Sequence, residues 1–334
     1  MRRALILGGT GAIGRATAER LLSAGWEVDL TGRDPTHMPA SLIALGARFH
    51  TAPPGGSPDL LVDCACFTAV DAERLLPLAR DAGSTVMISS KAVYVDAEGR
   101  HSNSDGAPHF DGPIHETQPT MAPSRGDHTT REGYGANKVA AERVLLDSGL
   151  PVTVLRPSKV HGAGARLPRE WVFVKRALDR RPVVLLAHHG EGGDHTSAAV
   201  NIAALIEVVA ALPGTRILNA ADPDAPNGLE ISRAIARHLG HERDEILLDD
   251  GAPAGLGGHP WDRRPPVVLD TSAARTLGHL PGGDYAATVG EEVDWLVNAV
   301  GGGDDAALAP SLDDPYFRPL LDYAAEDAYL RARR

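Results

Sequence analysis

Three glycines at three-residue steps near the start of the chain limit its fold more than any other feature. Gly8, Gly11 and Gly14 lie between an apolar run at residues 4–7 and a helical pattern over residues 12–24. Glycine there permits a tight turn and a close approach to a pyrophosphate, which the first N–H groups of the helix attract. A plain glycine turn is the simpler alternative, but its place at the first strand–helix junction favours a dinucleotide site.

Strands and helices alternate through the first half of the sequence. Strands are predicted over residues 4–7, 27–31, 48–51, 60–64, 85–89 and 152–155, and helices over 12–24, 70–82 and 134–147. This alternation implies right-handed crossovers and a parallel sheet with both faces covered. We therefore predict an α/β fold, a doubly wound parallel sheet of the Rossmann type.

The second half of the sequence is less regular and predicts a smaller C-terminal α/β substrate region. Helices are expected over residues 198–212, 229–239 and 286–299, short strands over 216–219, 246–248 and 267–269, a loop over 251–266 and a polar tail. The strand at 216–219 is predicted to return to the sheet. The NAD(P)-binding domain would span residues 1–165 plus about 190–225, and the substrate region about 166–189 plus 226–334.

Composition restricts the partners and the compartment. The chain has 33 basic and 44 acidic residues, a net charge of −11, which disfavours nucleic acid or an anionic membrane as the main partner. Cys64 and Cys66 are too close along a strand to form a disulfide framework, which fits a reducing, cytoplasmic setting. The first apolar run stops at Gly8, far short of a signal peptide or a membrane span, and no later run is long enough.

The end of the second predicted strand bears on the choice of cofactor. An acid there would bind the ribose 2′-hydroxyl of NAD, but Gly32 occupies the usual position and Arg33 follows it. A guanidinium suits a 2′-phosphate and favours NADP over NAD. Asp34 is the counter-argument, because a one-residue register error would restore an acid at this position. An exposed arginine in a turn is the structural alternative for Arg33.

The strongest catalytic signal is the pair Tyr134 and Lys138. Their four-residue spacing places the phenol and the ammonium on one helix face, one turn apart, where the cation would stabilise a phenolate during acid–base catalysis. Upstream, Ser89 and Ser90 end a predicted strand at the edge of the sheet where ligands bind. Ser90 is the better candidate to polarise a substrate carbonyl, although serines also commonly form turns there.

These motifs resemble, in kind and order, those of the extended short-chain dehydrogenase/reductases, and most closely the NAD-dependent epimerase/dehydratase family. The segments that carry the resemblance are the glycine turn, Ser-Ser-x-x-Val-Tyr at 89–94, Tyr-x-x-x-Lys at 134–138 and Leu-Arg-Pro-Ser-Lys-Val-His-Gly at 155–162. The similarity covers roughly residues 1–240. Dimers are common in that family, so a homodimer is one expectation.

The resemblance implies a role for each matching residue. Tyr134 would be the acid/base, Lys138 would hold the nicotinamide ribose and tune Tyr134, and Ser90 would be the catalytic hydroxyl, with Ser89 as the competing choice. Cys64 and its neighbours would run along the cofactor as packing residues, with no redox role. The full cofactor set would be Gly8, Thr10, Gly11, Ala12, Ile13, Gly14, Gly32, Arg33, Cys64, Ala65, Lys138, Pro157, Ser158 and Val160.

Several positions depart from the family pattern and bear on the substrate. Lys91 and Ala92 stand where the 4,6-dehydratases of the family carry an Asp-Glu pair, which argues against dehydration. His161 replaces a tyrosine and is either a second acid/base or a packed side chain. The candidate substrate contacts are Lys91, His161, Arg169, Trp171 and His195. The long segment 96–132 contains four histidines whose spacing fits no zinc pattern, so we expect a surface loop or lid and no metal site.

The leading hypothesis is an NADP(H)-dependent oxidoreductase that transfers hydride to or from a carbonyl/alcohol carbon of a small molecule. An NAD-dependent sugar-nucleotide epimerase is the enzymatic alternative. A non-catalytic nucleotide-binding regulatory or RNA-associated protein is the alternative from another class, which the intact Ser90, Tyr134 and Lys138 and the acidic charge disfavour.

Overall fold

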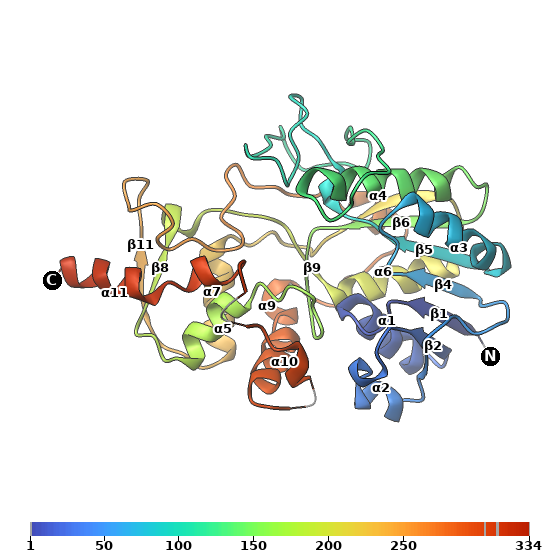
Figure 1. Ribbon diagram of the computed structural model, residues 1–334, viewed down its shortest axis with the longest axis horizontal. Helices are drawn as coiled ribbons and strands as arrows, with labels where there is room; N and C mark the ends of the chain where they lie inside the picture. Colours follow the sequence, from blue (N-terminus) through green and yellow to red (C-terminus); the bar gives the residue numbers. More distant parts are fainter. Residues whose placement is uncertain (1, 304, 312–313, 334) are drawn as a thin grey trace.

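A seven-stranded parallel sheet forms the larger lobe of the molecule (Figure 1). The computed structural model describes residues 2–303, 305–311 and 314–333. The strand order is β10-β6-β5-β4-β1-β2-β3, with all neighbouring strands parallel. The strands are β1 (Arg3–Leu7), β2 (Glu27–Thr31), β3 (Arg48–His50), β4 (Leu60–Asp63), β5 (Ser84–Ile88), β6 (Val152–Pro157) and β10 (Arg216–Ala220). This order reverses direction between β1 and β4, where doubly wound sheets bind ligands.

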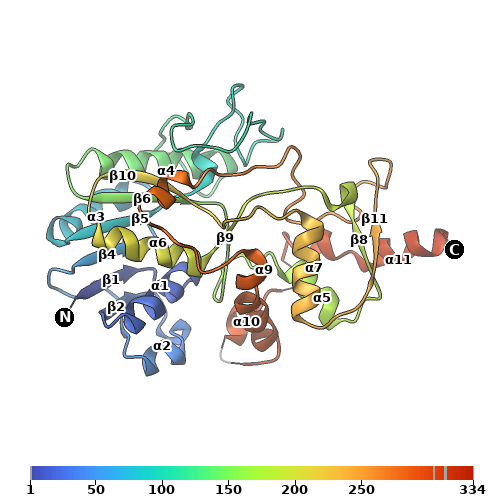
Figure 2. The ribbon, with the colours of Figure 1, turned by 180° about the vertical axis from the view of Figure 1, so that it is seen from behind.

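Helices cover both faces of this sheet. The helices α1 (Ala12–Ser23), α2 (Ala40–Ala44), α6 (Ala199–Ala211) and α8 (Ser272–Thr276) pack on one face, and α3 (Ala69–Asp81) and α4 (Arg131–Leu146) on the other (Figures 1 and 2). Successive strand residues point to opposite faces, so Ile6 and Val62 pack with α1 and α6 while Leu5 and Leu61 pack with α3 and α4. Burial on both sides explains why these strands read as continuous apolar runs.

The smaller lobe has its own aromatic core. It contains α5 (Trp171–Leu178), β8 (Val183–Leu186), α7 (Gly228–His238), β11 (Asp244–Leu247), α9 (Tyr285–Thr288), α10 (Gly290–Val300) and α11 (Tyr323–Ala332). β8 and β11 form a parallel pair, and Trp171, Phe173, Trp261 and Phe317 are buried between the helices. A second parallel pair, β7 (Lys159–His161) and β9 (Thr196–Ala198), lies where the two lobes meet.

The predicted fold class is confirmed, including the return of β10 to the sheet beside β6. The prediction of a strand at 267–269 is wrong, because the backbone hydrogen bonds of these residues go to different segments of the chain. Val267 pairs with Gly193 and accepts from His195, while the next carbonyl accepts from Ile114, so no continuous ladder forms. The expected helix 286–299 is instead two helices, α9 and α10, that meet at Val289 before a glycine, a poor helix former.

The sequence also missed elements of the smaller lobe. The polar tail contains α11, whose first turn is capped by Asp322 accepting from the Ala325 N–H. α5 and β8 lie in the region expected only to contact substrate. One helix beyond residue 226, α8, packs on the Rossmann core through Ala274, so the chain returns once to the larger lobe.

The long connection between β5 and α4 is mostly irregular, as expected, but it is tied down. The Asp96 carboxylate accepts hydrogen bonds from the backbone N–H groups of Glu98, Arg100 and His109. Gln118 donates to the Val95 carbonyl, which fastens the far end of the segment to the chain after β5. Among the described residues, no helix is both long and apolar enough to cross a membrane.

Candidate active site

A cavity of about 1410 Å³ runs along the carboxyl ends of the parallel strands, where the two lobes meet. Every residue of the predicted cofactor set lines it, and so do Ser90, Tyr134 and Lys138. The sheet therefore brings together residues that lie more than a hundred positions apart in the sequence.

The glycine turn between β1 and α1 is shaped to receive an anion. Gly8 has φ of +72°, which favours glycine, and a Cβ on Gly14 would lie 2.5 Å from the Gly9 Cα. Gly11 precedes α1 without any side-chain cap, and the first turn of α1 carries no acidic residue. The first N–H groups of the helix are therefore open to a phosphate, and the chain fits a dinucleotide cofactor here.

The end of β2 separates the roles of Arg33 and Asp34. The Asp34 carboxylate accepts from the Thr36 N–H at 2.9 Å and the Thr36 hydroxyl at 2.6 Å, and so caps the short turn that follows. Arg33 is exposed and lines the cavity together with His37. Beside them, a Cβ on Gly32 would lie 2.9 Å from the Phe49 ring, so a side chain at this position would have to displace that ring.

Lys138 is fixed by two backbone carbonyls at the floor of the cavity. Its buried Nζ donates to the Cys66 oxygen at 2.7 Å and the Ile88 oxygen at 2.9 Å. The half-buried Tyr134 lies one turn earlier on α4, and the Phe67 ring packs against both side chains, 4.4 Å from Nζ and 6.5 Å between ring centroids. An ammonium has three donors, so one remains for a ligand.

The two serines after β5 have different partners. The Ser89 hydroxyl donates to Glu142 at 2.5 Å, and Glu142 also forms a buried ion pair with Arg156. Ser90 is half-buried, and its oxygen accepts from the Ala92 N–H at 3.1 Å. The hydroxyl proton of Ser90 is therefore available to a ligand, whereas Ser89 is committed to the core.

The two cysteines lie beside the cofactor groove as packed thiols. Burial raises the pKa of Cys64 to about 12, and it raises the pKa of Cys66 as well. Asp63 adds to both shifts, while its own carboxylate accepts from the Ala65 N–H at 2.7 Å. Both thiols stay protonated near neutral pH, which supports the packing interpretation over a redox one.

Of the five predicted substrate contacts, the structure places two at the cavity. Lys91 and Arg169 line it. His161, Trp171 and His195 are buried elsewhere and do not line it. Sequence patterns could not separate these groups, because both kinds of residue flank the same strands.

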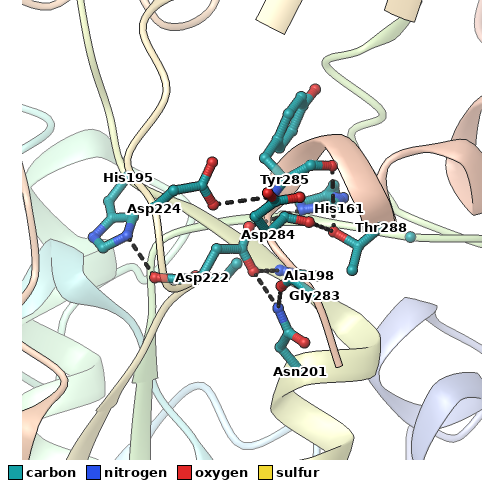
Figure 3. Close-up of polar contacts among 12 residues, drawn as sticks. His161, His195, Ala198, Asn201, Asp222, Asp224, Gly283, Asp284, Tyr285 and Thr288 are labelled. Carbon is teal, nitrogen blue, oxygen red and sulfur yellow. Dashed lines mark hydrogen bonds and ion pairs between the residues drawn. The ribbon is translucent and has the colours of Figure 1, made fainter. Parts of the chain in front are cut away.

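The three wrongly placed residues have structural partners. His161 Nε2 lies 3.0 Å from the Asp222 carboxylate, and His195 Nε2 lies 2.9 Å from the Asp222 carbonyl (Figure 3). His195 Nδ1 also accepts from the Leu269 N–H, and Trp171 belongs to the aromatic core of the smaller lobe. His161 is therefore a packed histidine and not a second acid/base at the cavity.

The ion pair of His161 and Asp222 links β7 to the segment that follows β10. Burial lowers the pKa of His161, but the hydrogen bond and charge of Asp222 outweigh burial and raise it above its ordinary value. Burial raises the pKa of Asp222, but His161 outweighs this effect and lowers it to about 2. Asp222 also accepts from the Ala198 N–H and the Asn201 amide, which satisfies the carboxylate (Figure 3).

His161 also belongs to a buried group of potential metal ligands. Ligand atoms of His161, Glu170 and Glu292 lie within 4.8 Å of one another. Burial raises the pKa of Glu292 well above its ordinary value, and the neighbouring Glu170 raises it further. The raised pKa of Glu292 favours its protonated form, which lets its carboxyl group lie beside Glu170 without a metal between them.

Sequence reasoning missed several residues on the substrate side of the cavity. Lys159, Asp194 and Arg263 line it, as do Ser102 and Asn103 of the long connection after β5. Lys159 lies inside the quoted segment 155–162 and could have been found there. The other residues come from irregular segments, for which the sequence carries no periodic signal.

The comparisons with known proteins identify the fold. No protein-family model matches the chain, and no curated protein matches it by sequence. Among solved structures, a dTDP-glucose 4,6-dehydratase from Bacillus anthracis in complex with NAD has a TM-score of 0.65 at 15% identity, covering 92% of this chain and 100% of that one. A UDP-N-acetylglucosamine 4-epimerase from Bacillus cereus has a TM-score of 0.66 at 16% identity, covering 88% of this chain and 98% of that one. A putative epimerase from Burkholderia cenocepacia has a TM-score of 0.64 at 22% identity, covering 88% of this chain and 97% of that one.

The chain thus shares, over about nine-tenths of its length, the fold of the extended short-chain dehydrogenase/reductases, the fold of NAD-dependent epimerases and dehydratases.

Proposed function

We propose that this protein is an NADP(H)-dependent oxidoreductase that interconverts a carbonyl and an alcohol on a small molecule. The observation that carries the proposal is that Ser90, Tyr134 and Lys138 line the same cavity as the glycine turn. When bound, the nicotinamide supplies or accepts the hydride. The residues of the chain supply the proton and hold the carbonyl.

Each of the three residues has a free group for its role. The Ser90 hydroxyl can donate to the carbonyl oxygen, since its own oxygen already accepts from Ala92. Tyr134 donates the proton to that oxygen during reduction and takes it back during oxidation. Lys138 keeps one N–H for the nicotinamide ribose and places its charge near the phenol, which favours the phenolate left after proton donation.

Three observations at the end of β2 support NADP as the cofactor. Asp34 caps the next turn and does not line the cavity, Gly32 carries no side chain, and Arg33 is exposed at the cavity. A ribose 2′-hydroxyl would find no carboxylate lining the cavity at these positions, whereas a 2′-phosphate would find a guanidinium. We also propose the domain division given above, with the smaller lobe binding the substrate.

The test compares Tyr134→Phe with the matched variant Tyr329→Phe, which removes a phenol from α11, outside the residues that line the cavity. Each variant is assayed for NADPH oxidation with a panel of aldehydes, ketones and keto sugars, and for NADPH binding by fluorescence titration. We expect Tyr134→Phe to lose roughly a hundredfold or more in turnover, since it removes the proton donor, while NADPH affinity is kept. Full activity of Tyr134→Phe would refute the mechanism.

A sugar-nucleotide epimerase is the second candidate, because the solved structures that share the fold include several epimerases, among them two in complex with NAD. Such an enzyme oxidises and re-reduces one carbon and shows no net consumption of the nicotinamide. The nucleotide released on denaturing the purified protein distinguishes the two. Stoichiometric bound NAD favours the epimerase, and a protein that exchanges NADPH freely favours the reductase.

A further inference from the structure

Three cations surround one buried carboxylate on the substrate side of the cavity. The Asp194 carboxylate contacts the Nζ of Lys91, lies 3.4 Å from the Nζ of Lys159 and lies 3.8 Å from the Nε of Arg263. The Asp194 side chain is 2% exposed and that of Lys91 is 7% exposed. All four residues line the cavity. We call them the Asp194 cluster.

The cluster carries more positive than negative charge. One carboxylate faces two ammonium groups and one guanidinium, and Arg169 also lines this side of the cavity. Burial lowers the pKa of Lys91 well below its ordinary value of 10.5, and the charges of Lys159, Arg263 and Arg169 lower it further. Gathering like charges in a buried place is unfavourable unless an anion balances them.

The composition of the chain makes this gathering unusual. The protein carries a net charge of −11, and its only lysines are Lys91, Lys138, Lys159 and Lys175. Three of these four line the cavity. Cations placed in a cleft of an acidic protein concentrate anionic ligands there.

The position of the cluster separates it from the cofactor phosphates. Lys91 directly follows Ser90, the expected catalytic hydroxyl, and Lys159 lies in the segment Pro157–Val160, which the family resemblance implies would lie against the nicotinamide. The turn expected to receive the pyrophosphate, by contrast, lies between β1 and α1, and Arg33 lies at the end of β2. The cluster therefore faces the reacting carbon rather than the phosphates of a bound dinucleotide.

We propose that the Asp194 cluster is an oxyanion subsite that binds a carboxylate or phosphate group of the substrate next to the carbonyl that Tyr134 protonates. This inference rests on the proposed function for the place of the reacting carbon. Lys159 and Arg263 are 19% and 23% exposed at their side chains, so they meet the anion directly. Lys91 is more deeply buried and contacts the Asp194 carboxylate, which lies between the three cationic side chains.

Arg263 also connects the subsite to the long connection after β5. Its Nη2 donates to the Ser102 carbonyl at 2.9 Å, and Ser102 lines the cavity as well. An anion bound by the guanidinium would therefore lie beside the segment expected to act as a lid.

The experiment measures anion binding separately from catalysis. Protein saturated with NADP⁺, so that the cofactor phosphate sites are filled, is titrated by calorimetry with inorganic phosphate and, in a second series, with malonate. Lys159→Gln and Arg263→Gln are compared with Arg264→Gln, the neighbouring arginine that is exposed, pairs with Asp250 and does not line the cavity.

We expect the wild type to bind at least one of the two anions, and Arg264→Gln to bind it equally well. Lys159→Gln and Arg263→Gln should each weaken that binding roughly tenfold, the loss expected for one charge-assisted hydrogen bond. Binding of phosphate alone assigns a phosphate group to the substrate, and binding of malonate alone assigns a carboxylate. No anion binding by the wild type, or equal binding by Arg263→Gln and Arg264→Gln, would overturn the proposal.

Two further measurements keep this result apart from the proposed reaction. Tyr134→Phe should bind the anion as the wild type does, so a failure of the catalytic proposal leaves the titration unchanged. Circular dichroism and NADP⁺ affinity show whether each variant is folded. If Lys159→Gln is not, Arg263→Gln alone decides the outcome, because Arg263 is the most exposed cation of the cluster.

Discussion

Replacing Arg33 with glutamine tests the choice of cofactor at a single side chain. Arg33 is exposed at the end of β2 and lines the cavity, whereas Asp34 is occupied by Thr36. A hydrogen bond to a charged group contributes about 1.5–3 kcal/mol, and solvent exposure places this one near the lower end. About 1.5 kcal/mol corresponds to roughly a tenfold change in dissociation constant.

We therefore expect Arg33→Gln to weaken NADPH binding about tenfold and to leave NADH binding unchanged. Fluorescence titration of both reduced nucleotides measures this, and the loss should shrink at high salt because exposed charges are screened. Arg80→Gln, which removes an exposed arginine of α3 that does not line the cavity, is the matched control.

Asp34→Asn tests the opposite assignment with the same assay. Asparagine is also a good cap, so the turn after β2 should persist. If Asp34 bound the ribose of NAD, this variant would weaken NADH binding; we expect no change. An equal loss of NADPH and NADH affinity in Arg33→Gln, or a loss of NADH affinity in Asp34→Asn, would refute the reasoning.

Three other predictions concern Lys138, the ion pair of His161 and Asp222, and the two cysteines. Lys138→Met leaves two buried carbonyls without their donor, so it should lower the free energy of unfolding by about 1–3 kcal/mol in urea titrations and also weaken NADPH binding. The pKa of Asp222 is lowered to about 2 from 3.8, so its contribution to stability is present above pH 3.8 and is lost as the pH falls towards 2. The pKa of His161 is raised above 6.5, so its contribution is full below that pH and is lost as the pH rises through the raised value. Asp222→Asn should therefore lower the free energy of unfolding by about 3–5 kcal/mol near pH 5 and by less near pH 9, and an equal loss at both would contradict the ion pair. Because burial raises the pKa of Cys64 and of Cys66, mass spectrometry should find both unmodified by iodoacetamide at pH 8 until the protein is unfolded.

The larger lobe was predictable because its signals are local. Each strand of the sheet is an apolar run bounded by turns, and Gly8 and Gly14 mark the first turn because their backbones cannot carry a side chain there. The order of elements then determines the sheet topology, since crossovers are right-handed. Residues at the carboxyl ends of the strands, such as Ser90 and Pro157, therefore reach one cavity wherever the exact strand boundaries lie.

The substrate side was less predictable because its contacts are distant in sequence. Asp194 and Arg263 meet Lys91 from irregular segments about 100 and 170 positions away, where no periodicity exists to read. His161 shows the converse problem. It lies close after β6, as the expected cofactor residues do, yet Asp222 and Tyr285 pack against it. Tyr285 belongs to α9, which is distant in sequence, so this burial cannot be predicted from the segment after β6 alone.

The carboxylates of the cavity limit the chemistry that it can support. Among the described residues, those that line it are Asp63, Asp71 and Asp194. Asp63 accepts from a backbone N–H, Asp71 caps α3, and Asp194 is held by the cations around it. A dehydration needs an acid and a base in addition to the hydroxyl that holds the carbonyl, and we expect none of these three held carboxylates to act as either. On the proposed function, proton transfer at this site falls to Tyr134, and the reaction is the gain or loss of hydride and proton at one carbon.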